Sequence, residues 1–127
     1  MKNINWSYRY LVTQPDLNAH GTLHGGNLMK WVDEACGMQA RLLTGSICAT
    51  RNISEINFIS SASCGDIVQI EVSFLKKGKT SITFYARVLN ASSGEEIAEF
   101  NRVVFVGIDE DGKSKALSMR KVENDTR

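Results

Sequence analysis

The segment from Asn27 to Leu43 has apolar residues at helical spacing, and they spread around most of the helix circumference. These residues are Leu28, Met29, Val32, Ala35, Cys36, Met38, Ala40, Leu42 and Leu43. Gly25 and Gly26 lie where this helix should start, and Thr44-Gly45 supplies a stop. A helix that is apolar on nearly all sides is enclosed by other structure. The remainder of the chain is therefore expected to wrap around it.

The remainder of the chain has the pattern of β-strands. Residues 6–13 are aromatic and β-branched and precede Gln14-Pro15-Asp16, which predicts a strand that enters a turn, and residues 16–24 read as a loop. Four further extended segments are Ile47–Ile59, Ile67–Lys77, Ser81–Leu89 and Ile97–Ile108. Tight turns join the last three, which predicts an antiparallel meander with one face on the helix. One helix and about five strands make an α+β architecture.

A chain of 127 residues suits one domain, which we expect to span residues 1–108. Residues 109–127 are charged and nearly aperiodic, and we expect this tail to be mobile or a small surface addition. The net charge of +1 gives no broad field for nucleic acid or an anionic membrane.

The three cysteines, Cys36, Cys48 and Cys64, are odd in number and have no metal-ligand spacing. A reduced, cytoplasmic setting is the simpler interpretation. The first ten residues lack the apolar core of a signal peptide, and no segment approaches the ~20 apolar residues of a membrane span. We expect no metal site and no cofactor.

The loop before the helix has the pattern Asn-x-x-Gly-x-x-His-Gly-Gly, which begins at Asn18, and an acidic residue, Asp33, follows two turns into the helix. This pattern, before one long helix wrapped by a five-stranded antiparallel sheet, resembles the hot-dog fold. The stretch from Asn18 to Ala35 is similar to the acyl-CoA thioesterase branch of that family. The similarity runs from about Val12 to Val106 and implies an enzyme that hydrolyses acyl-CoA to free acid and coenzyme A.

A second motif lies at the turn between two predicted strands and consists of Gly78, Lys79, Thr80 and Ser81. It resembles the place where this thioesterase branch meets the nucleotide end of coenzyme A. Its side chains could hold phosphates through charge-assisted bonds, with Arg51 and Arg102 as secondary candidates. The alternative is a solvated lysine edge that prevents aggregation of sheets. Ser60–Ser63 departs from the family, because many relatives have a Pro-containing turn there.

Asp33 is the first candidate for the catalytic group. It lies on the otherwise apolar stripe Met29, Asp33, Cys36 and Ala40, where desolvation would make a carboxylate a stronger base unless a donor is near. It can act as a general base on water or attack the thioester directly to give a mixed anhydride. The alternative role is a buried cap or an interface ion pair. Glu34 is expected on another face, solvated or paired.

The backbone N–H groups of Gly25, Gly26 and Asn27 can stabilise the oxyanion, because they have no partners in their own helix. The alternative is that the Gly pair only eases the start of the helix. Asn18 can donate to the thioester carbonyl or orient water, or it can shape the loop as an Asx-turn. His24 can assist proton transfer or serve as a structural loop residue.

In the resembling family the active site lies at a dimer interface. Asn18 and Asp33 are then expected to meet across two subunits, in a homodimer at minimum, and a hexamer built as a trimer of dimers is common in this branch. Two other functions stay open on the residues. One is a non-catalytic acyl-CoA-binding module, and the other is a hot-dog hydratase or dehydratase that uses His24 with Asp33 for proton transfer.

Overall fold

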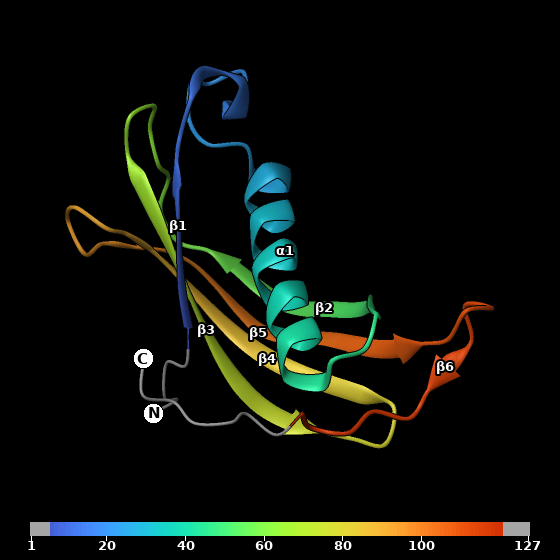
Figure 1. The fold of residues 1–127 in the computed structure, drawn as a ribbon. Helices are drawn as coiled ribbons and strands as arrows, with labels where there is room; N and C mark the ends of the chain where they lie inside the picture. The colour runs from blue at the N-terminus through green and yellow to red at the C-terminus, as the bar shows by residue number, and fades with distance from the viewer. Residues whose placement is uncertain (1–5, 121–127) are drawn as a thin grey trace.

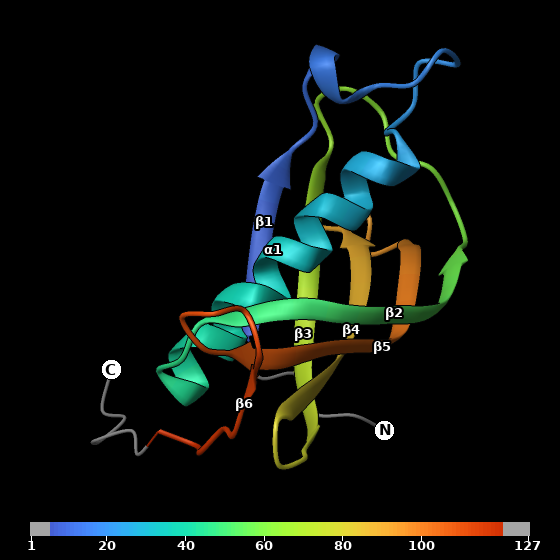
Figure 2. The ribbon, with the colours of Figure 1, turned by 90° about the vertical axis from the view of Figure 1, so that its right-hand side faces the viewer.

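The structure is a computed structural model that describes residues 6–120, and in it a single long helix packs on one antiparallel sheet (Figures 1 and 2). The elements are β1 (Trp6–Leu11), the 3-10 turn η1 (Gln14–Asp16), α1 (Gly25–Thr44), β2 (Cys48–Phe58), β3 (Ile67–Lys77), β4 (Ser81–Asn90), β5 (Glu96–Ile108) and β6 (Ser114–Lys115). The strand order is β1-β3-β4-β5-β2, and β6 pairs with β5. The predicted α+β architecture is confirmed.

The strands β3, β4 and β5 form the predicted meander, since each is hydrogen-bonded to the next along the chain. Side chains alternate between the two faces of a strand, so every second residue of this meander faces the helix. The largest of the fully buried side chains in the meander are Ile70, Ile82, Phe84, Ile97 and Phe100. Burial of these residues against α1 forms the core and fixes the register of the strands.

The helix α1 begins two residues earlier than predicted, because Gly25 and Gly26 form its first turn. His24 is its N-cap, and Gly45 ends it in the left-handed conformation with a φ of 68°. The buried residues of α1 are Leu28, Trp31, Val32, Ala35, Cys36, Gln39, Ala40 and Thr44. They form the face that packs on the sheet.

The expectation that the helix is enclosed on nearly all sides is wrong for the single chain. The sheet covers one side of α1, whereas Met38 and Leu42 on the other side are 45% and 57% exposed. Ile47, which follows the helix, is 59% exposed. These three side chains form an apolar surface beside β2, which is an edge strand of the sheet. The apolar pattern of the helix therefore exceeds what its own sheet can cover.

The first part of the predicted tail is packed on the domain. Its residues Ser114 and Lys115 form β6 on β5, and Leu117 is only 4% exposed and belongs to the core. The charged composition of the tail gave no sign of this packing, because Leu117 is the one side chain of its described part that enters the core. The division of the chain at residue 108 stays a prediction, and the rest of the tail, residues 121–127, lies outside the described residues.

Candidate active site

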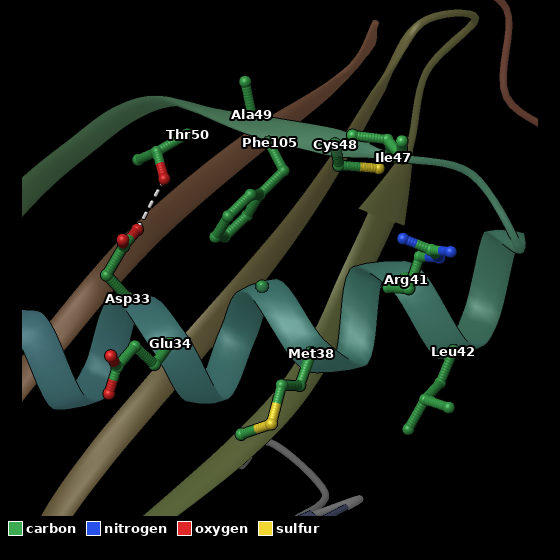
Figure 3. Close-up of a pocket in the computed structure, with 11 residues that line it drawn as sticks. Asp33, Glu34, Met38, Arg41, Leu42, Ile47, Cys48, Ala49, Thr50 and Phe105 are labelled. Carbon is green, nitrogen blue, oxygen red and sulfur yellow. Dashed lines mark hydrogen bonds between the residues drawn. The ribbon is translucent and has the colours of Figure 1, made fainter.

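Asp33 lies on α1 and is held by a residue of the neighbouring strand. Thr50 Oγ1 on β2 donates a hydrogen bond of 2.5 Å to Asp33 Oδ1, and the dashed line in Figure 3 marks it. Asp33 is half-buried, so it is partly shielded from solvent without being enclosed in the core. The sequence interpretation allowed for a nearby donor, and Thr50 is that donor.

A pocket of about 800 Å³ opens between α1 and the start of β2, and Asp33 lies in its wall (Figure 3). Most of the wall is apolar and consists of Gly37, Met38, Leu42, Ile47, Cys48, Ala49 and Phe105, with Glu34 and Arg41 as its charged members besides Asp33. A Cβ atom on Gly37 would lie 3.3 Å from the Phe105 ring, so glycine keeps the helix close to this wall. An apolar pocket with one oriented carboxylate suits an apolar substrate chain that ends in a reactive carbonyl.

Cys36 is close enough to Asp33 to be a competing nucleophile, but its environment keeps it a thiol. Burial raises the pKa of the Cys36 thiol, and the negative charge of Asp33 raises that pKa further. The thiolate is the nucleophilic form of cysteine. Cys36 is therefore a packing residue of the core, and Asp33 stays the candidate for the catalytic group on this side of the helix.

Asn18 shapes the loop before the helix. Its Oδ1 accepts hydrogen bonds from the backbone N–H groups of His20 and Thr22 at 2.9 and 3.1 Å, and its Nδ2 donates to Thr22 Oγ1 at 3.1 Å. The Asx-turn alternative thus describes what this side chain does within one chain. Within residues 6–120 this is the one bond from Nδ2, so its second amide hydrogen is available to a ligand. Asn18 also lines a second, smaller pocket of about 320 Å³ together with Gly25 and Phe58.

The start of the helix offers fewer unpaired donors than the sequence predicts. His24 Nδ1 accepts from the N–H of Gly26 at 2.9 Å and from that of Asn27 at 3.4 Å, so the His24 side chain caps the helix. The N–H of Gly25 has no hydrogen-bond partner within residues 6–120, and Gly25 lines the second pocket. Of the three predicted oxyanion donors, Gly25 is thus the one with an unpaired N–H in this structure, whereas the Gly26 N–H is paired with His24.

The two halves of the candidate site lie apart in one chain. Asp33 lines the pocket beside the start of β2, whereas Asn18 and Gly25 line the pocket beside its end at Phe58. Gly25 and Asp33 are eight residues apart on α1, which corresponds to about 12 Å along the helix axis. A single chain therefore does not bring Asn18 and Asp33 together, and the role of the pair stays a prediction.

The turn Gly78–Ser81 lies at the end of the sheet nearest the Asp33 pocket. Thr50, Phe105 and Ile82 form one row across β2, β5 and β4, and Ser81 belongs to the next row outward. The Gly78 N–H donates to the Ser81 carbonyl at 2.8 Å and closes the turn, while the Lys79 side chain is exposed. Figure 2 shows this turn at the bottom of the molecule and the loop before α1 at the top.

Two residues that matter to the geometry were not predicted. Thr50 and Phe105 lie in long extended segments with no local signal, and they reach the site only because β2 and β5 pair beside α1. Of the secondary basic candidates, Arg51 and Arg102 are both exposed, and Arg51 lies at the irregularity in the β2–β5 register between Thr50 and Asn52. His20 is exposed as expected.

Within residues 6–120, no group of three or more His, Cys, Asp or Glu side chains has the arrangement of a metal site. In the same part of the chain, α1 lacks the combination of length and apolar character that a membrane-crossing helix needs.

Comparison with known proteins identifies the family. Residues 20–97 match the model of the thioesterase superfamily. The chain is 30% identical over 115 residues to a protein of Buchnera aphidicola subsp. Baizongia pistaciae described as an uncharacterized acyl-CoA thioester hydrolase, with 86% of this chain and 85% of that protein covered.

Solved structures agree with this match. A hexameric acyl-CoA thioesterase, crystallised in its apo form, superposes with a TM-score of 0.79 at 31% identity and covers 94% of this chain and 78% of its own. A hexameric hot-dog fold thioesterase of Campylobacter jejuni, at 23% identity and a TM-score of 0.78 over 87% of this chain and 88% of its own, supports the fold. The chain therefore belongs to the thioesterase superfamily, among the acyl-CoA thioester hydrolases of the hot-dog fold.

Proposed function

We propose that this protein hydrolyses the thioester of acyl-CoA and that Asp33 drives the reaction. The observation that carries the proposal is the Asp33 carboxylate, which Thr50 orients in the wall of an apolar pocket. Thioester hydrolysis requires a positioned base or nucleophile, a polarised carbonyl, and a pocket that separates the acyl chain from bulk water. Asp33 supplies the first of these, and the apolar wall supplies the third.

Two chemical routes are open to Asp33. As a general base it takes a proton from water while the water oxygen attacks the thioester carbonyl; the tetrahedral intermediate then breaks its C–S bond and expels the thiolate of coenzyme A, which takes up that proton. As a nucleophile its oxygen attacks the carbonyl directly and releases the thiolate of coenzyme A, and water then cleaves the mixed anhydride. In both routes Thr50 occupies Oδ1, so the reacting atom is Oδ2.

The carbonyl oxygen needs donors, and the second pocket has them. The Gly25 N–H lies at the positive end of the helix macrodipole and has no partner within the described residues. The spare amide hydrogen of Asn18 is in the same pocket. These groups line a different pocket from Asp33, which is the reason to look for a second subunit.

An antiparallel pair of β2 edge strands from two copies would complete the site. β2 is an edge of the sheet, and it runs from Cys48 in the Asp33 pocket to Phe58 in the Asn18 pocket. Two-fold antiparallel pairing of such a strand sets the start of one copy beside the end of the other. The Asp33 pocket of one subunit then faces Asn18 and Gly25 of the second, and the exposed apolar side chains at both pockets are covered.

This arrangement makes a homodimer the minimal active unit. The hexameric state of the thioesterase structures to which the chain is similar is compatible with three such dimers. Lys79, Thr80 and Ser81 then bind the nucleotide end of coenzyme A at the turn between β3 and β4, close to the Asp33 end of the sheet. A cytoplasmic location stays a prediction.

The hydratase alternative is less well supported by the geometry. It requires the imidazole of His24 as a proton carrier, but His24 Nδ1 already accepts from two backbone N–H groups. The binding-module alternative gives no reason for the orientation of Asp33 by Thr50. Hydrolysis uses Asp33 together with Thr50 and leaves the His24 cap of the helix in place.

Release of coenzyme A from acyl-CoA by the purified protein, followed with a thiol-reactive dye, tests the proposal. We expect wild-type protein to release thiol and Asp33→Asn to lower kcat by about 10²–10⁴-fold, the usual contribution of a general base. Asp33→Asn should still bind acyl-CoA, because the amide preserves the size of the side chain. Saturable binding without turnover by the wild type would favour the binding module, and full turnover by Asp33→Asn would exclude Asp33 from the mechanism.

A further inference from the structure

The turn that we assign to the nucleotide end of coenzyme A is held by the C-terminal segment Lys115–Leu117, here called the strap. The Leu117 N–H donates to the Lys79 carbonyl at 2.8 Å. Lys77 Nζ donates to the carbonyls of Gly78 and Leu117 at 2.8 and 2.9 Å. Residues 38 apart in sequence, Lys79 and Leu117, are therefore joined through backbone bonds.

The strap lies flat on β5 because residue 107 is glycine. Lys115 pairs with Gly107, and a Cβ atom there would lie 2.5 Å from Leu117 Cδ2 and 2.8 Å from the Lys115 carbonyl oxygen. No side chain larger than hydrogen fits without displacing the strap. The Leu117 side chain, only 4% exposed, anchors the segment in the core.

In this turn the backbone carbonyl groups are hydrogen-bonded, whereas two of the backbone N–H groups are not. Three successive carbonyls of the turn are occupied by donors from outside it: that of Gly78 by the adjacent Lys77 Nζ, that of Lys79 by the Leu117 N–H, and that of Thr80 by the Gly107 N–H at 2.9 Å. The N–H groups of Lys79 and Thr80 have no protein partner within residues 6–120. A carbonyl oxygen repels a phosphate and an N–H group attracts it, so this pattern leaves the turn with its donors free for an anion.

We propose that the strap is the positioning element of the coenzyme A site and that Leu117 and Lys77 act through the turn without touching the substrate. The inference rests on the proposed function, because it assumes that the turn binds the nucleotide phosphates. It separates two nearby lysines: Lys79, in the turn, is exposed and meets the substrate, whereas Lys77, the last residue of β3, is half-buried and holds the strap. Loss of the strap releases the carbonyls of the turn and weakens phosphate binding.

The test compares two substrates that carry the same acyl group. One is the acyl-CoA, and the other is the acyl thioester of N-acetylcysteamine, which lacks the nucleotide. For Leu117→Ala and Gly107→Ala, we expect the KM for acyl-CoA to rise about tenfold, with kcat within about twofold of wild type. The KM for the N-acetylcysteamine thioester should not change. Met119→Ala is the matched control, because Met119 lies two residues beyond the strap and is 42% exposed.

Removing a buried side chain can also unfold the protein, so a milder variant is included. Lys77→Met keeps the aliphatic stem and removes the bonds from Nζ to the Gly78 and Leu117 carbonyls together with one positive charge, and Lys76→Met, at the exposed neighbouring lysine, is the control for that charge. All variants are assayed well below their thermal unfolding midpoints. The expected result for Lys77→Met is the same selective rise in KM, of about threefold to tenfold. A rise in KM that is equal for both substrates would overturn the proposal, because it would indicate general damage.

The variant Lys79→Glu tests whether the turn binds the nucleotide at all, independently of the strap. If Lys79→Glu raises the KM for acyl-CoA and the folded strap variants do not, the strap has no positioning role and the coenzyme A site stands. If Lys79→Glu leaves that KM unchanged, the turn does not bind the nucleotide, and the strap proposal falls with it. Competitive inhibition by 3′-phospho-ADP, the nucleotide end of coenzyme A, must weaken in parallel with the KM for acyl-CoA.

Discussion

Asp33 on α1 and Thr50 on β2 are joined by a hydrogen bond of 2.5 Å, which fixes the carboxylate at the junction between the helix and the edge of the sheet. The bond engages Oδ1 and thereby also fixes the orientation of the second carboxylate oxygen, Oδ2. A group that is held in one orientation needs no reorganisation at the moment of reaction. The Asp33–Thr50 pair is thus the most specific geometric feature of the candidate site.

Thr50→Val should lower kcat by about tenfold, since it removes one charge-assisted hydrogen bond and leaves the shape of the side chain nearly unchanged. KM should change little, because Thr50 acts on Asp33 and not on the nucleotide. Steady-state kinetics with acyl-CoA measure both parameters. Thr50→Ser is the control, since it retains the hydroxyl. Equal kcat values for the valine and serine variants would show that the bond does not orient the catalytic carboxylate.

Mixed oligomers test whether the site is shared between subunits. Asp33→Asn should be inactive and Asn18→Ala should be impaired. A dimer with one copy of each has one site with both changes and one site with neither. Co-expression with two different affinity tags isolates this species, and we expect it to recover about half of the wild-type activity per dimer. No recovery in a correctly assembled mixed dimer would mean that Asn18 and Asp33 act within one chain.

Lys79→Glu should raise the KM for acyl-CoA, because it replaces an attraction for phosphate with a repulsion. A change of about tenfold or more is expected at low ionic strength, and added salt should reduce the difference between variant and wild type. A thioester without the nucleotide should be hydrolysed as before. Lys113→Glu is a control for net charge, because Lys113 is also exposed but lies outside the turn. If both variants raise the KM for acyl-CoA equally, the effect comes from net charge and not from a phosphate contact of Lys79.

Asp16 makes the loop before the helix sensitive to acid. Its carboxylate accepts from the Thr13 N–H at 2.8 Å, from Thr13 Oγ1 at 2.9 Å and from Asn27 Nδ2 at 3.1 Å. The bond from the Thr13 N–H is the main cause that lowers the pKa of Asp16 below its ordinary value of 3.8, and the Thr13 hydroxyl adds to the effect.

Because the folded-state pKa of Asp16 is the lower one, its charged form stabilises the fold above the unfolded-state pKa, and this contribution is lost as the pH falls through the folded-state pKa. The gap in unfolding free energy between wild type and Asp16→Asn should therefore be constant from about pH 5 to pH 7 and shrink below about pH 4. Chemical denaturation across this range measures it. A gap that does not change with pH would contradict the assignment.

The regular elements were predictable because their signals are local. The alternation runs through most of β3 and β4, and the helical spacing repeats over several turns of α1. Signals of this length predict the type of element without knowledge of tertiary contacts. The first turn of α1 was missed because two glycines are poor helix formers, and the His24 cap that stabilises them is a side-chain contact. The motif that contains Asn18 and Asp33 pointed to the correct family.

Local sequence patterns were enough to predict the strands, the long helix, the meander and the presence of a carboxylate on an apolar helix, because each of these depends on residues that are neighbours along the chain. Three other features became visible in the folded chain: Thr50 holds Asp33, Asn18 and Asp33 lie in separate pockets, and Leu117 reaches the turn at Lys79. These contacts join residues that are far apart in sequence. They depend on which strands pair and on where the helix crosses the sheet, and no local pattern carries that information.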